Sequence, residues 1–231
     1  LVFDLMFVKS MKSNPKSDKA LVDVFKKYKN VFTAMNLDNQ PEDLRPAVEL
    51  PKKLAIVEDF DGSYHAMEFT NCRTIIDGIL NSTSNIGLIN VSRYEDGVLR
   101  RMPLYLKYKR KLYPQLGYLV GNHYLQKFTD NPMPKNLHTH GEGDVILNWY
   151  GPTGTFENIP MYKLLKAVEG KSKFNYNFSG KVVYFGATAS SLFDIKTVPV
   201  DKVYPGVEVQ ATYVNNLIDG SLILKVSDDV N

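Results

Sequence analysis

The last quarter of the chain constrains the fold more than any other segment. Residues 182–185 are four consecutive apolar residues, which is typical of a short buried strand, and a polar loop follows them. Pro205 and Gly206 then begin a segment whose apolar residues recur at helical spacing as far as Ile218, and Gly220 suits the end of a helix. A buried strand followed by an amphipathic helix predicts an α/β fold.

The first 35 residues predict the same class. Residues 1–7 are an apolar run that only Asp4 interrupts, which indicates a strand. Ser17 and Asp18 are candidate N-caps of a helix with an apolar face, and residues 31–35 form the next apolar run. A strand, a helix and a second strand in this order predict a right-handed crossover within a parallel sheet.

The middle of the chain predicts an antiparallel insertion. Residues 98–108 and 112–114 indicate a ribbon, because turn residues precede the first segment and separate the two. Helices are expected at 114–128 and 161–168, with a strand at 144–150, whereas the pattern of residues 37–70 does not fix their pairing. We therefore expect one α/β domain over residues 1–231: a mainly parallel sheet flanked by helices, with an antiparallel ribbon inserted.

Composition excludes several classes of protein. A chain of 231 residues with 44% hydrophobic and 23% charged residues can bury one sizeable core. Its net charge of +3 is spread along the sequence, which argues against a nucleic-acid partner. Cys72 is alone, so neither an internal disulfide nor a cysteine-rich metal site can form. No apolar run is long enough to span a membrane, and the chain opens directly in a strand, so we expect a fragment of a larger protein.

The sequence lacks the common catalytic patterns. It contains no nucleophile elbow, no glycine-rich phosphate loop and no dinucleotide-binding fingerprint. His138 and His140, with Glu142 and Asp144 nearby, offer metal-ligand chemistry. Two histidines in a loop without a third ligand of known geometry are more often solvated, so we predict neither a metal nor a cofactor.

Two aspartates are the best candidates for a ligand pocket. Asp4 lies in the first apolar run, and Asp194 follows the loop after the strand at 182–185. Ligands of open α/β sheets bind beyond the carboxyl ends of the strands, where such loops converge. The functional interpretation is a small-molecule pocket containing Asp4, Thr188, Ser190 and Asp194. The structural alternative is that these groups hydrogen-bond loop backbone, and we favour this alternative.

Arg100 is a further candidate. Side chains alternate along a strand, and Arg100 shares its parity with an apolar set that includes Val98 and Met102. We expect Arg100 to be buried and to contact Asp4 or Asp194, because an unpaired buried charge is costly. Such a pair is either a structural clamp or a site at which an anionic ligand competes. A bulge at Pro103 would shift the alternation.

Five short motifs, in order, are similar to those of a known family. They are Phe3-Asp4, the turn 96–100 (Asp-Gly-Val-Leu-Arg), the segment 180–186 with its glycines at both ends, Asp194 five residues before Pro199, and 205–208 (Pro-Gly-Val-Glu). In this order the chain resembles the second type of CHASE domain, an extracellular sensory domain that precedes cyclases and kinases.

That resemblance implies a non-catalytic sensor on the periplasmic or extracellular side of the membrane. Its ligand, a small molecule or an anion, would act through membrane helices on a cytoplasmic adenylate or guanylate cyclase, or otherwise on a histidine kinase. The alternatives are a stand-alone α/β hydrolase using Ser190 or Ser191, and a dimerisation module without a ligand. A homodimer is compatible with the sensor as well.

Overall fold

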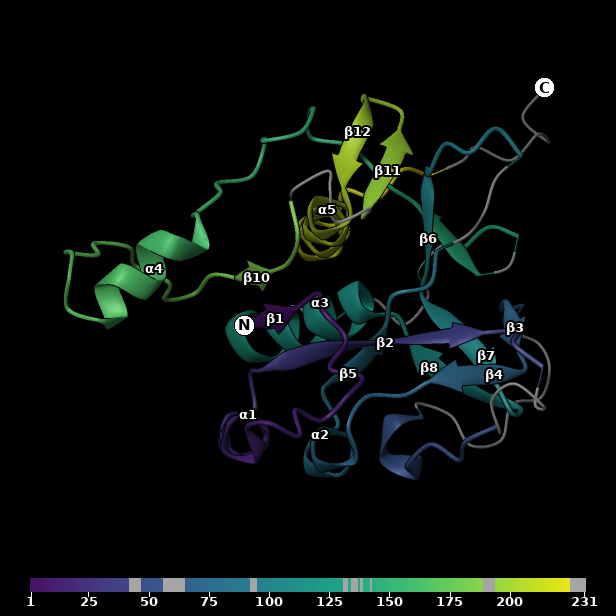
Figure 1. The fold of residues 1–231 in the computed structure, drawn as a ribbon. Helices are drawn as coiled ribbons and strands as arrows, with labels where there is room; N and C mark the ends of the chain where they lie inside the picture. Colours follow the sequence, from purple (N-terminus) through teal and green to yellow (C-terminus); the bar gives the residue numbers. More distant parts are fainter. Residues whose placement is uncertain are drawn as a thin grey trace, which may run out of the picture.

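The chain folds into a mixed α/β structure, as the sequence predicts, in a computed structural model that describes residues 1–41, 47–55, 65–91, 95–130, 133, 137, 139–141, 143–188 and 194–224 (Figure 1). The helices are α1 (Pro15–Lys27), the 3-10 helix η1 (Lys52–Leu54), α2 (Asp77–Ser82), α3 (Leu116–Phe128), α4 (Met161–Val168) and α5 (Gly206–Asp219). The strands are β1 (Val2–Phe3), β2 (Phe32–Asp38), β3 (Glu68–Phe69), β4 (Asn71–Arg73), β5 (Ile86–Leu88), β6 (Arg101–Pro103), β7 (Tyr105–Tyr108), β8 (Lys111–Pro114), β9 (Asp144–Ile146), β10 (Tyr184–Phe185), β11 (Ile195–Val198) and β12 (Asp201–Pro205).

Parallel strands form the centre of the sheet. β1 pairs in parallel with β10 on one side and with β2 on the other, and β2 pairs in parallel with β5. The second half of β2 pairs with β4 in the antiparallel sense. The predicted crossover from the first strand through a helix to the second strand is therefore confirmed, with β2 as the long central strand (Figure 1).

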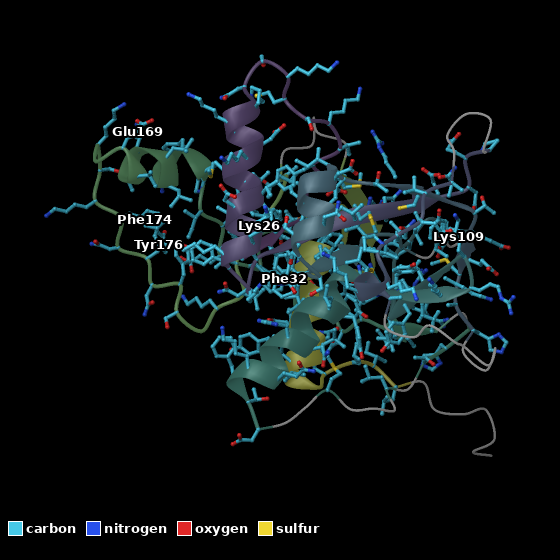
Figure 2. All side chains as sticks on the ribbon, turned by 90° about the horizontal axis from the view of Figure 1, so that it is seen from below. Lys26, Phe32, Lys109, Glu169, Phe174 and Tyr176 are labelled. Atoms are coloured by element: carbon cyan, nitrogen blue, oxygen red, sulfur yellow. The ribbon has the colours of Figure 1, made fainter. Side chains whose placement is uncertain are left out.

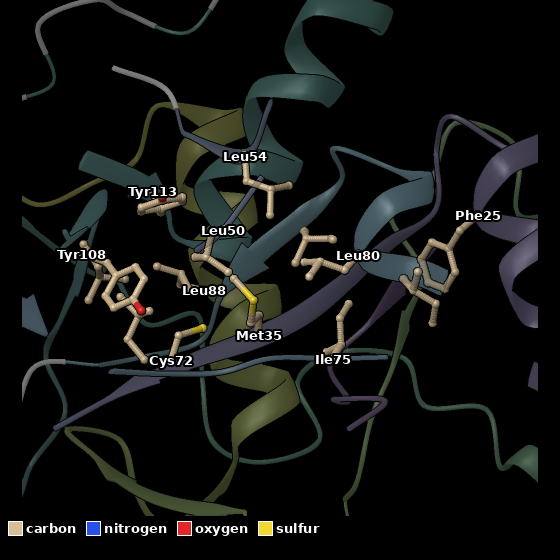
Figure 3. Packing of buried hydrophobic residues seen from close by; sticks show 14 of the residues in the cluster. Phe25, Met35, Leu50, Leu54, Cys72, Ile75, Leu80, Leu88, Tyr108 and Tyr113 are labelled. Carbon is tan, nitrogen blue, oxygen red and sulfur yellow. The ribbon is translucent and has the colours of Figure 1, made fainter. Parts of the chain in front are cut away.

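The two faces of the sheet are covered by different helices. Figure 1 shows α1 and α2 on one side and α3 and α5 on the other. Along β2, Met35 and Leu37 belong to the buried cluster that includes Phe25 of α1 (Figure 3). Phe32 and Ala34, of the opposite parity, belong to a second cluster with residues of α3 and α5. This strict alternation fixes which β2 side chains point toward α5.

Smaller pairings surround this sheet. β7 and β8 form the predicted antiparallel ribbon, whose tight turn holds Lys109 and Arg110 at φ 48° and 62°. β6 pairs instead with β9, and β11 with β12, and these pairs share a third buried cluster with α3 and α5. Cys72 is fully buried. In the described part of the chain, no helix is both long and apolar enough to cross a bilayer.

Three local predictions were wrong. The first strand spans only Val2–Phe3, so Asp4 follows the strand and does not lie within it. Helix α1 begins at Pro15, and the Asp18 carboxylate accepts a hydrogen bond from the Met11 amide at 2.8 Å, so Ser17 and Asp18 are not N-caps. The strand at 182–185 shortens to β10, which is half-exposed because it forms the edge of the sheet.

Residues 151–183 form an arm that departs from this body. It carries α4, none of whose residues is buried, and Figure 1 shows it set apart from the sheet. Phe174 and Tyr176 lie on the arm, where their ring centroids are 4.9 Å apart (Figure 2). Figure 2 also shows Lys109, at the tip of the ribbon, at the opposite end of the molecule. The helix at 161–168 has the predicted bounds, but it packs on no sheet.

Candidate functional site

A cavity of about 1050 Å³ opens beyond the carboxyl ends of β1, β2 and β5. The chain order reverses at β1, which has β2 on one side and β10 on the other, and such a switch point is where open α/β sheets bind ligands. Its lining residues are 4–6, 36–40, 67–69, 89–91, Asp194, Lys196, Gly206, Val209 and Gln210. The sheet and the first turns of α5 therefore share one cavity.

Asp4 stands at the end of β1 on the wall of this cavity. Its backbone amide donates to the carbonyl of Phe185 at 2.9 Å, which fixes the residue between β1 and β10. In the described residues, its carboxyl group has neither a hydrogen bond nor a salt bridge. Burial, together with the charge of Asp194, raises the pKa of Asp4 to about 7, while Lys196 opposes the rise. Near neutral pH this carboxyl group is therefore only partly ionised.

Asp194 and Lys196 lie next to the start of α5. The Lys196 ammonium is 3.3 Å from an Asp194 carboxylate oxygen, and the Asp194 carbonyl accepts from the Gly206 amide at 2.9 Å. The Asp194 carboxylate rests directly against the α-carbon of Gly206, so any side chain at 206 would collide with it. A glycine here lets the acidic group approach the positive end of the helix dipole.

Gln210 supplies a hydrogen-bond donor from α5. Its side chain is 4% exposed, and its carbonyl oxygen accepts from the Gln115 amide nitrogen at 3.2 Å. The orientation of Gln115 is fixed, because its own side-chain oxygen caps the Gly117 amide at the start of α3. The Gln210 amide nitrogen has no acceptor in the described part of the chain and is left to the cavity that Gln210 lines.

Two asparagines complete the polar wall. The Asn90 side chain, just after β5, accepts from the Leu37 amide at 2.8 Å and donates to the Leu37 carbonyl at 2.7 Å. This exchange ties the end of β5 to β2. Asn36 shares the parity of Phe32 and Ala34, so it extends the α5-facing side of β2 into the cavity.

A comparison with protein families identifies the chain. The model of the CHASE2 domain matches residues 1–230. The chain belongs to the CHASE2 family. CHASE2 domains are extracellular sensory domains of signalling receptors and are not catalytic, which favours the sensor over the hydrolase among the predicted functions. Searches of curated proteins and of solved structures gave no match.

The predicted site residues of this CHASE2 domain fall into three groups. Asp4 and Asp194 line the same cavity, as expected from their places after two strands. Thr188 is exposed and lines a different cavity, on the other side of β10. Ser190 and its neighbour Ser191 lie outside the described residues. The structure thus brings the two aspartates to one cavity and Thr188 to another, and ligand binding by these residues stays a prediction.

The prediction for Arg100 was wrong. Its side chain is 44% exposed and forms an ion pair with Asp96 at 2.7 Å, four residues earlier, and it lines neither cavity. The physical reason is that the strand starts only at Arg101, and Met102, Pro103 and Leu104 are buried in succession. Leu99, the residue before Arg100, is buried as well, so the alternation already changes between Leu99 and Met102, and Arg100 points outward.

A second cavity, of about 700 Å³, separates the arm from β10 and α5. Its walls are mostly aromatic and aliphatic and include Phe174, Tyr176 and Tyr184. The Tyr184 hydroxyl is buried without a hydrogen-bond partner among the described residues, and burial raises its pKa well above the ordinary value. Polar side chains, among them Asn177, Lys181 and Asn215, line this cavity as well, but Asp4, Asp194 and Gln210 do not.

The histidines do not assemble a metal site in the part of the chain that is described. His140 and Asp144 exchange backbone hydrogen bonds of 2.8 and 2.9 Å, whereas His138 and Glu142 lie outside the described residues. His123, in α3, packs edge-on against Phe32 with ring centroids 5.1 Å apart. These contacts explain His123 and His140 as structural residues.

Sequence reasoning missed Gln210, Lys196 and Asn36. Gln210 carried a usable signal, because it lies three residues after Val207 and so falls on the apolar stripe of α5. Asn36 carried a similar one, since it extends the alternation of Phe32 and Ala34. A polar residue on an apolar face needs a partner, and here the cavity provides the space for one.

Proposed function

We propose that this CHASE2 domain is the periplasmic or extracellular ligand sensor of a transmembrane receptor that regulates an adenylate or guanylate cyclase. The observation that supports it is the cavity beside Asp4, which the carboxyl edge of the sheet and helix α5 build together. A ligand there contacts both the fixed sheet and the helix that leads out of the domain. A receptor with a kinase as its output domain would sense the ligand through the same cavity.

Helix α5 gives the route from the cavity to the rest of the receptor. Gln210 and Gly220 are ten residues apart, roughly 15 Å along a helix. At the far end, the Asn216 side chain accepts from the Asn148 amide at 2.7 Å and donates to its carbonyl at 3.0 Å. Gly220 ends the helix at φ 66° and directs the chain into residues 222–224. A shift of α5 therefore moves the segment after Gly220.

The prediction that this helix docks on the sheet is confirmed, because ten of its residues are buried. Residues 222–224, which follow the helix, are more exposed to solvent than the helix is. Ile223 and Leu224 are 45% and 68% exposed, and Ile223 makes one isolated bridge to Ile146. Residues 225–231, which the predicted route of transmission also includes, lie outside the described residues.

A receptor chimera tests the proposal. The chain, joined through membrane helices to an adenylate cyclase, is exposed to pools of small metabolites while cyclic AMP is measured. We expect at least one pool to change the output, and expect Asp4→Asn and Gln210→Leu to abolish that response. Asp23→Asn, an exposed carboxylate on α1, is the matched control. A response that survives both cavity variants contradicts the proposal.

The exposed face of α4 supports a second candidate function, dimerisation without a ligand. Tyr162, Leu165 and Val168 are 57%, 49% and 79% exposed, which leaves an apolar helix face open to a partner. Sedimentation of the wild-type chain and of Leu165→Lys distinguishes this candidate. A dimer that the lysine dissociates supports it, and a monomeric wild-type chain contradicts it.

A further inference from the structure

The walls of the cavity beside Asp4 are acidic. Among the described residues, its lining holds the carboxylates of Asp4, Asp38, Glu68 and Asp194 and the ammonium group of Lys196. A Glu68 carboxylate oxygen is 3.4 Å from Lys107 Nζ, an Asp194 oxygen is 3.3 Å from Lys196 Nζ, and Asp38 accepts from the Gln40 amide at 3.2 Å. Asp4 is half-buried, and its carboxyl group has neither a hydrogen bond nor a salt bridge among the described residues. A cation is therefore the group that this wall lacks.

A donor faces the same space from α5. The Gln210 side chain is more than nine-tenths buried, and its orientation is set by Gln115, so its amide nitrogen, which has no acceptor among the described residues, faces the cavity. This donor is independent of the acidic side chains, and an oxygen acceptor on a ligand would satisfy it.

We propose that the ligand of this cavity is a small organic cation, with a primary ammonium group at Asp4 and Asp194 and a neutral hydroxyl or carbonyl oxygen at the Gln210 amide. Amino sugars and amino alcohols have this chemistry. The inference rests on the proposed sensory function of the cavity. A volume of about 1050 Å³ accommodates a ligand the size of a sugar.

The same geometry disfavours two other classes of ligand. An anion would meet Asp4 and Asp194 at short range in a partly desolvated space, where like charges repel strongly. The anionic ligand expected from the sequence depended on Arg100, which lies outside this cavity. A bare divalent cation prefers six or more oxygen ligands, and the described residues contain no group of three metal-ligating acidic or histidine side chains.

Calorimetric titration of the 231-residue chain tests the inference. The probe is D-glucosamine, and N-acetyl-D-glucosamine is its neutral counterpart, because acetylation removes the charge and leaves the ring hydroxyls. Ethanolamine and calcium chloride are further arms. We expect D-glucosamine or ethanolamine to bind with a Kd of roughly 10 μM to 1 mM, and the neutral sugar to bind at least about tenfold more weakly.

Three variants make the test specific to the site. Asp4→Asn keeps the shape of the side chain and removes its charge, and Gln210→Leu removes the donor at the other end of the ligand. Each should weaken binding about tenfold or more, whereas Asp23→Asn should leave it unchanged. If Asp4→Asn does not fold, the binding measured with Gln210→Leu still tests whether the ligand occupies this cavity.

Each remaining outcome overturns the inference. These are the absence of saturable binding by both amines, equal binding of the acetylated sugar, binding of calcium alone, or amine binding that both cavity variants retain. The titration needs no output domain, so a chimera that responds to a non-amine pool would preserve the proposed function while this inference fails.

Discussion

The cavity beside Asp4 and the arm at residues 151–183 differ in what they bury. The cavity holds polar groups that are enclosed by the sheet and α5, and its Gln210 is 4% exposed. The arm holds apolar groups that are open to solvent, and its Val168 is 79% exposed. The arm therefore exposes apolar side chains that a partner could cover, whereas the cavity encloses polar side chains that the proposed ligand would contact.

The arm is held to the body at its root by polar contacts. The Thr153 amide donates to Asp201 at 3.1 Å, and its hydroxyl donates to the Val203 carbonyl at 2.8 Å. The Gly154 amide donates to the Glu208 carboxylate at 3.0 Å. Glu208 belongs to α5, so the arm and the cavity are attached to the same helix.

The largest expected difference is in the unfolding free energy lost when a buried or an exposed aromatic ring is removed. Phe25→Ala removes a fully buried side chain that packs beside Phe3 and Phe7, and should cost roughly 3–5 kcal/mol of unfolding free energy. Phe178→Ala, on the arm, removes a ring that is 38% exposed and should cost less than about 1.5 kcal/mol. Urea denaturation measures both, and equal costs would break the distinction between body and arm.

Asp4→Asn should stabilise the chain at neutral and alkaline pH. The carboxyl group ionises near pH 3.8 when unfolded and near pH 7 when folded. Below about pH 4 both states hold the proton and the group costs nothing. As the pH rises toward 7, the unfolded chain releases the proton first, so the wild type loses stability that the variant keeps. The gain should reach roughly 2–4 kcal/mol near pH 8.

Denaturation at several pH values checks this prediction. The difference between Asp4→Asn and the wild type should grow from about pH 4 to about pH 7 and then stay constant. Asp23→Asn is the control and should show no such growth, since Asp23 is exposed. A difference for Asp4→Asn that does not depend on pH would mean that the cavity does not desolvate this group.

Glu208→Ala should release the root of the arm. It leaves the Gly154 amide without its acceptor, which should cost roughly 1–2 kcal/mol and open residues 157–181 to proteolysis. Limited proteolysis with mass spectrometry locates the cuts. Asp23→Ala, which changes an exposed carboxylate on α1, is the comparison, and arm cleavage that is equal in the two variants would contradict the role of Glu208.

The smallest effect is expected on the exposed face of α4. Leu165→Lys should change the unfolding free energy of the monomer by less than about 0.5 kcal/mol, because Leu165 is 49% exposed. Thermal denaturation at low protein concentration measures it. A loss as large as that of Phe25→Ala would show that α4 is buried against another part of the chain.

Much of the fold was predictable because it follows local periodicity. The parity of β2, the helix that ends at Gly220 and the β7–β8 ribbon each depend on side chains a few residues apart. The convergence of Asp4 and Asp194 was predictable for a related reason, since the carboxyl ends of neighbouring parallel strands meet at one edge.

The rest depends on contacts between distant segments. The prediction for Arg100 was wrong because β6 pairs with β9 and does not continue the β7–β8 ribbon. The sequence does not show where one strand pairing ends and the other begins. Lys196 gave no signal, because lysines are common in strands, and only the structure shows that this one is 3.3 Å from an Asp194 carboxylate oxygen. The orientation of the Gln210 amide nitrogen could not be predicted, because Gln115, which donates to the Gln210 side-chain oxygen, is 95 residues away in the sequence.

Direct titration of the Asp4 carboxyl group by carbon-13 NMR tests most directly the claim that the cavity holds an unpaired acidic group ready for a cationic ligand. The account predicts a pKa of about 7 for Asp4 in the free chain, because burial and Asp194 disfavour its ionised form. With D-glucosamine bound, the pKa should fall, since the ammonium group stabilises the carboxylate. A pKa of Asp4 near its ordinary value in the free chain, unchanged by D-glucosamine, would contradict the claim.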